Sequence, residues 1–289
     1  MSKRLAGALL SAATIAGALL AAPGAEGAAG HHRRDCGSGS SYRNAELVGL
    51  TADQRLICFD ADRPGAARDI GRVRGLVSDT RLVGIDVRPA NGLLYGLGDQ
   101  AGIYTVDLGN GRVSLVARAT VPLRGTSFGV DFNPAADRLR VASDAGQNLR
   151  VNVADGSTTA DGDLAYTPGT PATGVSGAAY TNNDADPNTG TTLFDVDSTL
   201  DQVAIQSPPN NGSLVATGKL GADTGADVAF DIDSRIRRGT TVANTAYAAL
   251  STPDGSSFHS VDLLTGRASD ASRFDRDDRI VGIAVVDDS

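Results

Sequence analysis

The feature that most constrains this chain is an internal repeat of 45 residues, the distance from Gly84 to Gly129. The stretch 81–111 contains short apolar segments separated by turn residues, and it recurs one unit later without a gap. Eight positions match at this spacing: Gly84, Asp86, Pro89, Ala90, Leu94, Asp99, Val106 and Gly111 recur as Gly129, Asp131, Pro134, Ala135, Leu139, Asp144, Val151 and Gly156. A repeat of about 40–50 residues is typical of solenoids and propellers.

The apolar segments of the repeat have the character of strands. They are short, alternating and rich in β-branched residues, and the turns between them read Pro-Ala-Asn-Gly and Gly-Asn-Gly. These features predict strands at 82–87, 93–97, 102–107 and 112–117. Four antiparallel strands in one repeat form a propeller blade. Two looser units follow, and each carries an insertion between its first and second strands.

The two ends of the repeat region predict a closed ring. The segment 47–60 matches the second and third strands of a unit, and no first strand precedes it. The missing strand stands near the C-terminal end, where 279–283 (RIVGI) repeats 81–85 (RLVGI). Pairing of this strand with the N-terminal blade removes the open sheet edges. We therefore predict an all-β fold, a five-bladed β-propeller of four-stranded antiparallel blades closed by the C-terminal strand. The alternative is an open solenoid.

The N-terminal residues indicate export from the cytoplasm. Lys3 and Arg4 precede an apolar stretch and a region of small residues, so residues 1–30 are expected to be a signal peptide; the alternative is a retained membrane anchor. Residues 31–46 form a polar leader, and residues 47–289 form one propeller domain. We expect a secreted, monomeric protein that does not insert into the membrane after cleavage. The net charge of −8 argues against nucleic acid as a partner.

The chain has only two cysteines, Cys36 and Cys58. In an oxidising compartment an even pair predicts one disulfide, which would attach the polar leader to the first blade. The alternative is two unpaired thiols. The one histidine of the ring, His259, is expected to be a packing or surface residue, and we identify no catalytic residue.

The clearest local motif for a cation is the acidic insertion of the fourth unit. Asp184, Asp186 and Asn188 place oxygen-bearing side chains at alternate positions, which is a pattern that can surround Ca²⁺. Thr189 stands where an EF-hand loop requires glycine, and no helix flanks the segment. The alternative is a polar turn in which these side chains bond their own backbone.

A second candidate cation site comes from the repeat itself. Asp86, Asp131 and Asp231 occupy the same position on the innermost strand of three blades, so their carboxylates are expected to face the central channel. The equivalent positions in the other two units are Ala179 and Ala284, which leaves the ring of carboxylates incomplete. The alternative is that each aspartate accepts a hydrogen bond from the backbone of a neighbouring blade.

Several long connections are predicted to gather on one face over the fourth and fifth blades. They are the acidic insertion, a basic insertion in the fifth unit and a turn between the third and fourth strands of the fourth unit. Long loops on a rigid scaffold often carry function. The residues that we assign to this binding face are Asn182, Asn183, Arg235, Arg237, Arg238, Asn210 and Asn211. A surface ion pair between the acidic and basic insertions is the alternative.

The motifs at 84–86, 129–134, 179–183 and 208–212 resemble those of the bacterial domain-of-unknown-function family 4394, over about residues 47–286. More loosely, the blades look like those of lactonase-like propellers. The resemblance implies an extracytoplasmic propeller and supplies no catalytic residues. We therefore expect a secreted scaffold that binds an unknown extracellular ligand or protein without catalysis. The alternative is a Ca²⁺-dependent lactonase-like hydrolase with a metal at the channel mouth.

Overall fold

The computed structural model describes residues 46–167, 170–186, 188–252, 255–269, 271–274 and 278–286. The predicted signal peptide and the leader up to residue 45 lie outside this range. So does Cys36, and the predicted disulfide with the buried Cys58 stays a prediction. No helix among the described residues is long and apolar enough to cross a membrane.

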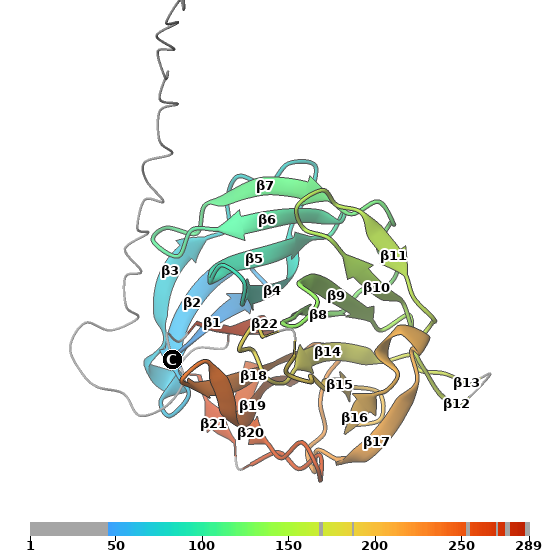
Figure 1. The fold of residues 1–289 in the computed structure, drawn as a ribbon. Coiled ribbons are helices and arrows are strands. Elements are labelled where there is room, and N and C mark those ends of the chain that lie inside the picture. Colours follow the sequence, from blue (N-terminus) through green and yellow to red (C-terminus); the bar gives the residue numbers. More distant parts are fainter. Residues whose placement is uncertain are drawn as a thin grey trace, which may run out of the picture. The chain divides into compact units, whose positions relative to one another are not determined.

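Five four-stranded antiparallel sheets form the fold, and Figure 1 shows them arranged as blades around a central axis. The repeat residues build the second blade from β4 (Leu82–Arg88), β5 (Leu93–Gly98), β6 (Gly102–Val106) and β7 (Val113–Arg118). The third blade contains β8 (Phe128–Asn133), β9 (Arg138–Ser143), β10 (Asn148–Val151) and β11 (Thr158–Ala160). The predicted strand boundaries are therefore confirmed to within one residue in the second blade.

The fourth and fifth blades carry the looser repeats. The fourth blade contains β14 (Val175–Tyr180), β15 (Leu193–Asp197), β16 (Gln202–Gln206) and β17 (Leu214–Lys219). The fifth contains β18 (Val228–Arg237), β19 (Thr240–Thr252), β20 (Gly255–Val261) and β21 (Ser272–Arg273). A small hairpin, β12 (Ala165–Thr167) and β13 (Thr170–Pro171), lies between the third and fourth blades in the chain, and two short 3₁₀ turns, η1 (Pro64–Ala66) and η2 (Pro209–Asn211), occur in connections.

The predicted closure of the ring is confirmed. The first blade combines β1 (Glu46–Thr51), β2 (Arg55–Asp60) and β3 (Arg68–Arg72) with β22 (Ile280–Val285) from the other end of the chain. The strands β1 and β22 are antiparallel, with Leu47 opposite Val285 and Gly49 opposite Ile283. Because β22 supplies the innermost strand of the first blade, all five innermost strands surround the channel (Figure 1).

The hydrophobic core is divided among the interfaces between blades. Each of five apolar clusters within the described residues joins one blade to the next, as when Phe132 of β8 packs beside Tyr95 of β5. The cluster between the third and fourth blades is built largely from small side chains such as Ala142, Ala178 and Ala204. Both faces of most strands are therefore buried, which fits their nearly continuous apolar sequences.

The basic insertion of the fifth unit differs from its prediction as a loop. The strands β18 and β19 continue past the neighbouring hairpins, with Arg237 opposite Thr240. Arg238 and Gly239 form the two-residue turn, at φ values of 56° and 78°. Two consecutive residues with positive φ are typical of the tight turn that closes a hairpin. The insertion therefore lengthens two paired strands, and it is no irregular loop.

Candidate functional site

The innermost strands approach one another closely around the channel, and this explains the glycine that recurs in the repeat. A Cβ atom added to Gly84, Gly129 or Gly177 would lie 2.5, 2.5 or 2.7 Å from the next innermost strand. A side chain has no room there, since glycine in a strand often marks a place where another backbone approaches. We call this constriction, formed by residues 84–85, 128–130, 176–177, 228–230 and 281–283, the neck of the channel; the space in it is about 10 Å³.

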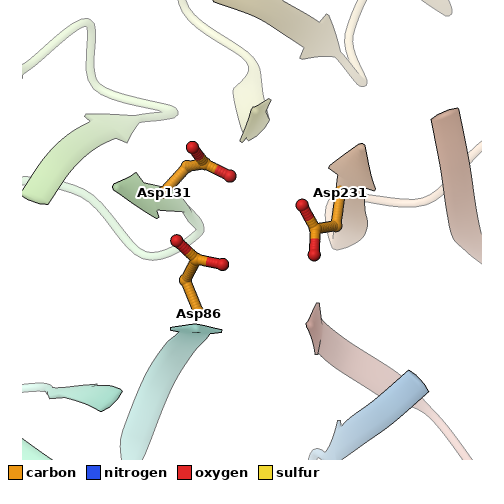
Figure 2. A group of neighbouring side chains, drawn as sticks. All are labelled: Asp86, Asp131 and Asp231. Carbon is orange, nitrogen blue, oxygen red and sulfur yellow. The ribbon is translucent and has the colours of Figure 1, made fainter. Parts of the chain in front are cut away.

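Three aspartates converge just beyond the neck. Asp86 on β4, Asp131 on β8 and Asp231 on β18 point toward one another from three blades, as Figure 2 shows. One carboxylate oxygen of each lies within 4.8 Å of the others. All three side chains are buried, with exposed fractions of 6, 2 and 3%. The three residues that the repeat placed at equivalent positions are thus brought together in space.

Each of these aspartates is bonded to the innermost strand of the next blade. In each case the carboxylate accepts a hydrogen bond from a backbone N–H of that strand. The donor is the residue that follows the position equivalent to the aspartate. The bonds run from Phe132 N to Asp86 Oδ2 (2.6 Å), from Tyr180 N to Asp131 Oδ1 (3.1 Å) and from Val285 N to Asp231 Oδ2 (2.7 Å). The predicted contact with the neighbouring backbone is therefore confirmed.

The two alanine blades change how the remaining oxygens are used. The alanine side chains of the first and fourth blades cannot accept a hydrogen bond. The backbone N–H of Val87 therefore lacks an acceptor from Ala284, and that of Ile232 lacks one from Ala179. These two N–H groups are bonded instead by the aspartate preceding them, at 2.7 Å to Asp86 Oδ1 and 2.6 Å to Asp231 Oδ1. Asp86 and Asp231 thus use both oxygens. Among the described residues, Asp131 accepts a hydrogen bond through Oδ1 alone.

The cluster consists of three acidic side chains, and their burial disfavours ionisation. Desolvation raises the pKa of Asp86 and Asp131 well above the ordinary range, and the neighbouring carboxylates raise it further. Burial also raises the pKa of Asp231, to about 6, against the lowering effect of its two backbone N–H donors. No basic side chain contributes to any of these shifts. Protons or a cation must therefore compensate the cluster.

The residues fit a hard divalent cation. Carboxylate oxygens are the ligands that Ca²⁺ prefers, and it takes six to eight of them, including water and backbone carbonyls. Three convergent carboxylates supply the charge, and the second oxygen of Asp131 accepts no other hydrogen bond among the described residues. The chemical capacity of the arrangement is electrostatic: three convergent carboxyl groups can coordinate a cation or share protons.

On the other side of the neck the channel widens. We call this part the channel mouth; residues 52, 54, 81–83, 126–128, 176, 226–228, 279 and 281 line a cavity of about 280 Å³. These residues are the beginnings of the innermost strands, the residues just before them and one turn of the first blade. Along the axis the order is therefore mouth, neck and carboxylates. This cavity could not be predicted from the sequence, because its residues come from six separate segments of the chain.

The acidic insertion has the hydrogen bonding of a polar turn. Asp184 Oδ1 accepts from Asp186 N (3.0 Å), and Asp186 Oδ1 accepts from both nitrogens of Asn188 (2.9 Å each). The other oxygen of Asp184 accepts from the N–H and the hydroxyl of Thr241 on β19, each at 3.1 Å. Pro187 lies outside the described residues. These bonds anchor the insertion to the fifth blade, and cation binding at Asp184, Asp186 and Asn188 stays a prediction.

The residues assigned to the binding face divide into two groups. Asn182 bonds Asn244 of β19 through its side chain (2.9 Å) and its N–H (3.1 Å), and the N–H of Asn183 bonds Ser234 Oγ (3.1 Å). Such contacts join the fourth blade to the fifth. Asn210 and Asn211 lie in η2, where Asn210 joins the fourth blade to the third by bonding Arg140.

The second group of that face projects into solvent. Arg235, Arg237 and Arg238 are exposed at the tip of the β18–β19 hairpin, and no described residue forms an ion pair with them. A groove of about 630 Å³ lies between the fourth and fifth blades, lined among others by Thr181, Asn244 and Leu264. The role of these arginines and of this face in binding stays a prediction.

A buried polar network between the third and fourth blades was missed by the sequence analysis. Arg140 on β9 is 1% exposed, and its guanidinium group donates to Asp161 (2.7 Å), Asn148 (2.7 Å), Asn210 (3.0 Å) and Tyr180 (3.1 Å). The available signal was an arginine in the middle of an apolar strand. A buried arginine needs such partners, so the network fixes the contact between these two blades.

His259 on β20 is buried, so of the two predicted roles, packing and surface, it has the packing role. Its Nδ1 lies 2.7 Å from the carbonyl oxygen of Ser269, and its Nε2 lies 2.8 Å from Ser257 Oγ. Since only Nδ1–H can donate to the carbonyl, Nε2 accepts the serine hydroxyl. The imidazole thereby links β20 to the segment that follows it.

The fold and channel define a class, the five-bladed β-propeller. A family profile described as "Domain of unknown function (DUF4394)" matches residues 55–284, and the chain belongs to this family. No functionally curated protein matches the chain.

Several solved structures resemble the chain at low sequence identity. A chain of a nidogen/laminin complex is 11% identical with a TM-score of 0.48, and the match covers 84% of this chain and 98% of that one. An auxiliary nutrient-binding protein from Bacteroides ovatus is 14% identical with a TM-score of 0.42, covering 70% and 55%. A protein from Lactobacillus plantarum is 12% identical with a TM-score of 0.39, covering 83% and 98%. With TM-scores below 0.5, these likenesses carry no argument about function.

Proposed function

We propose that this protein is an extracytoplasmic binding propeller whose central channel binds a divalent cation, with Ca²⁺ as the first candidate. The observation that carries the proposal is the convergence of Asp86, Asp131 and Asp231 within 4.8 Å, buried and without a basic partner. A cation would compensate this charge at neutral pH and would tie three blades together. Location outside the cytoplasm rests on the predicted signal peptide.

Binding without catalysis is favoured over the lactonase-like alternative. A metal-dependent hydrolase needs a substrate beside the metal. The cavities at the mouth and in the neck are lined by residues that precede the aspartates, and neither is lined by their carboxylates. At least one oxygen of each carboxylate is also engaged by a backbone N–H. We therefore propose a cation that stabilises the ring and contributes to its electrostatic field.

Thermal unfolding with Ca²⁺ and with a chelator tests the proposal. A ligand that binds only the native state stabilises it by about 2.7 kcal/mol at a hundredfold excess over Kd. For a domain of this size, that is a rise of roughly 5–10 °C in Tm. We expect this rise in the wild type and its loss in Asp131→Asn, which keeps an oxygen to accept the Tyr180 N–H.

The control variant is Asp186→Asn, which removes a carboxylate from the other predicted cation site. It should retain the full response to Ca²⁺. Equal melting of the wild type with Ca²⁺ and with chelator would contradict the proposal. A response lost in Asp186→Asn and kept in Asp131→Asn would move the cation to the acidic insertion.

A further inference from the structure

The channel mouth is a concave cavity with a mixed lining. Leu82, Val83, Phe128, Val228 and Val281 contribute apolar surface, and polar or charged side chains make up about half of the lining residues. Sites for small molecules are concave and combine apolar walls with convergent polar groups, and the polar share here favours a polar ligand. The cavity of about 280 Å³ is just below the range of roughly 300–1,000 Å³ usual for drug-sized ligands. It therefore suits a small ligand.

Two guanidinium groups stand at the rim of the mouth. Arg81 and Arg279 are both exposed there. Arg279 pairs through Nη2 with Asp227, whereas the Arg81 guanidinium forms no ion pair with a described residue. Asp99 lies beside Arg81 and accepts its backbone N–H at 3.5 Å, and, against the raising effect of burial, the charge of Arg81 helps to lower the pKa of Asp99. The rim therefore offers an anion the guanidinium donors of Arg81 and the remaining donors of Arg279.

One polar side chain at the bottom of the mouth has no partner. Ser176 is 2% exposed, lines both the mouth and the neck, and its Oγ forms no hydrogen bond with a described residue. The other polar side chains of the wall are engaged: Gln54 bonds both backbone groups of Leu82, and Ser127 donates to Asp227 at 2.8 Å. An unsatisfied buried hydroxyl costs free energy that a ligand atom would recover.

We propose that the channel mouth binds a small organic acid. Its carboxylate lies between Arg81 and Arg279, its apolar body lies against Phe128 and Val228, and a second polar atom reaches Ser176 Oγ. Guanidinium groups bind carboxylates through parallel N–H donors, which gives both attraction and orientation. The inference rests on the proposed binding function because it names a ligand class for the same channel. It does not require the cation, because the neck separates the two positions.

Binding of small carboxylates to the full chain tests this assignment. A panel of aliphatic and aromatic monocarboxylates, including benzoate, would be measured by titration calorimetry and ligand-observed NMR, each beside its neutral primary amide. We expect at least one acid to bind, with its amide weaker by about tenfold or more. Arg81→Gln should weaken the acid by a similar factor, whereas Arg112→Gln, at an exposed arginine just before β7, should not.

Two further variants separate this site from the cation site. Ser176→Ala should weaken only those acids that carry a second polar group, and its unchanged Tm would exclude a folding defect. Asp131→Asn should leave acid binding unchanged while it removes the Ca²⁺ response. The assignment would be overturned if no carboxylate bound, if amides bound as well as acids, or if Arg81→Gln and Arg112→Gln had equal effects.

Discussion

Two buried aspartates of this propeller, Asp231 in the channel and Asp195 between the third and fourth blades, differ in their hydrogen bonds and in their pKa values. Both are shielded from solvent, at 3 and 0% exposure. Asp231 accepts two backbone N–H groups, and burial raises its pKa to about 6. Neither oxygen of Asp195 has a hydrogen-bond partner among the described residues, and burial raises its pKa to about 8 despite the nearby Arg140. In this pair the backbone donors, more than depth, account for the lower pKa of Asp231. Asp86, with two such donors, keeps a high pKa because burial raises it and the charge of Asp231 adds to that effect.

A residue near Asp195 could accept a hydrogen bond from its protonated carboxyl group. Gln206 Oε1 is also buried without a partner. Leu193 pairs with Gln206 and Asp195 with Ala204, so Asp195 and Gln206 stand at diagonal positions on one face of the β15–β16 pair. Diagonal neighbours in a sheet are within reach of long side chains. A protonated Asp195 is a donor, and Gln206 Oε1 is the acceptor that lacks one.

The largest loss of stability should come from removing a carboxylate in which both oxygens accept a hydrogen bond. Asp86→Ala leaves the N–H groups of Val87 and Phe132 buried without an acceptor. At about 1–3 kcal/mol for each unsatisfied donor, we expect the free energy of unfolding to fall by roughly 2–6 kcal/mol. Chemical denaturation measures the loss, and Asp86→Asn, which keeps one acceptor, should lose less. An alanine variant as stable as the wild type would show that these bonds contribute little.

An intermediate effect concerns pH. A folded pKa above the unfolded value means that the folded state binds the proton more tightly. The stabilisation is then complete below the unfolded pKa, near 3.9, and is lost as pH rises through the folded pKa. For Asp195 the window is about pH 4 to 8, with a slope of up to about 1.4 kcal/mol per pH unit. Asp231 contributes in the same direction only up to about pH 6.

Asp195→Asn tests this contribution because it imitates the protonated acid. Measured by denaturation in chelator, the decline in stability between pH 6 and 8 should be shallower in the variant than in the wild type. The variant should be about as stable as the wild type near pH 5. Parallel pH profiles for the two proteins would mean that Asp195 is already ionised, and the contrast with Asp231 would fail.

The smallest effect should come from an aspartate at the surface. Asp186→Ala removes the two hydrogen bonds that Asn188 donates within the acidic insertion. Surface substitutions usually change stability by no more than about 0.5 kcal/mol. The denaturation midpoint should therefore stay close to that of the wild type, and a loss near that of Asp86→Ala would give the insertion a structural weight that its exposure does not suggest.

The fold could be predicted because the repeat encodes it at every level. A constant spacing of 45 residues gave the blade, and the split unit at the two ends gave the closure. The convergence of Asp86, Asp131 and Asp231 followed from the same register, since equivalent positions on innermost strands must face one axis. Hydrogen bonds from these aspartates to the backbone of the next blade could be predicted as an alternative for the same reason.

What could not be predicted depends on contacts that break the repeat. The charge of Arg140 acts on Asp195 only because the third and fourth blades pack together, and no local pattern specifies which side chains face each other there. The long hairpin at Arg235–Arg238 contains charged residues and a glycine, which favour a loop interpretation, although cross-strand pairing decides otherwise. The channel mouth draws one to three residues from each of six segments, so no single motif contains it.

The pairing of β22 with β1 has a consequence for how the chain assembles. Ribosomes make β22 after every other described strand, so the first blade stays without its inner edge while the other four can already form. Contacts between strands so distant in sequence slow folding, because a long loop must close first. Pairing of β22 with β1 closes the ring and also completes the lining of the channel. A ligand of the channel would therefore bind, and stabilise, only those chains in which this pairing has formed.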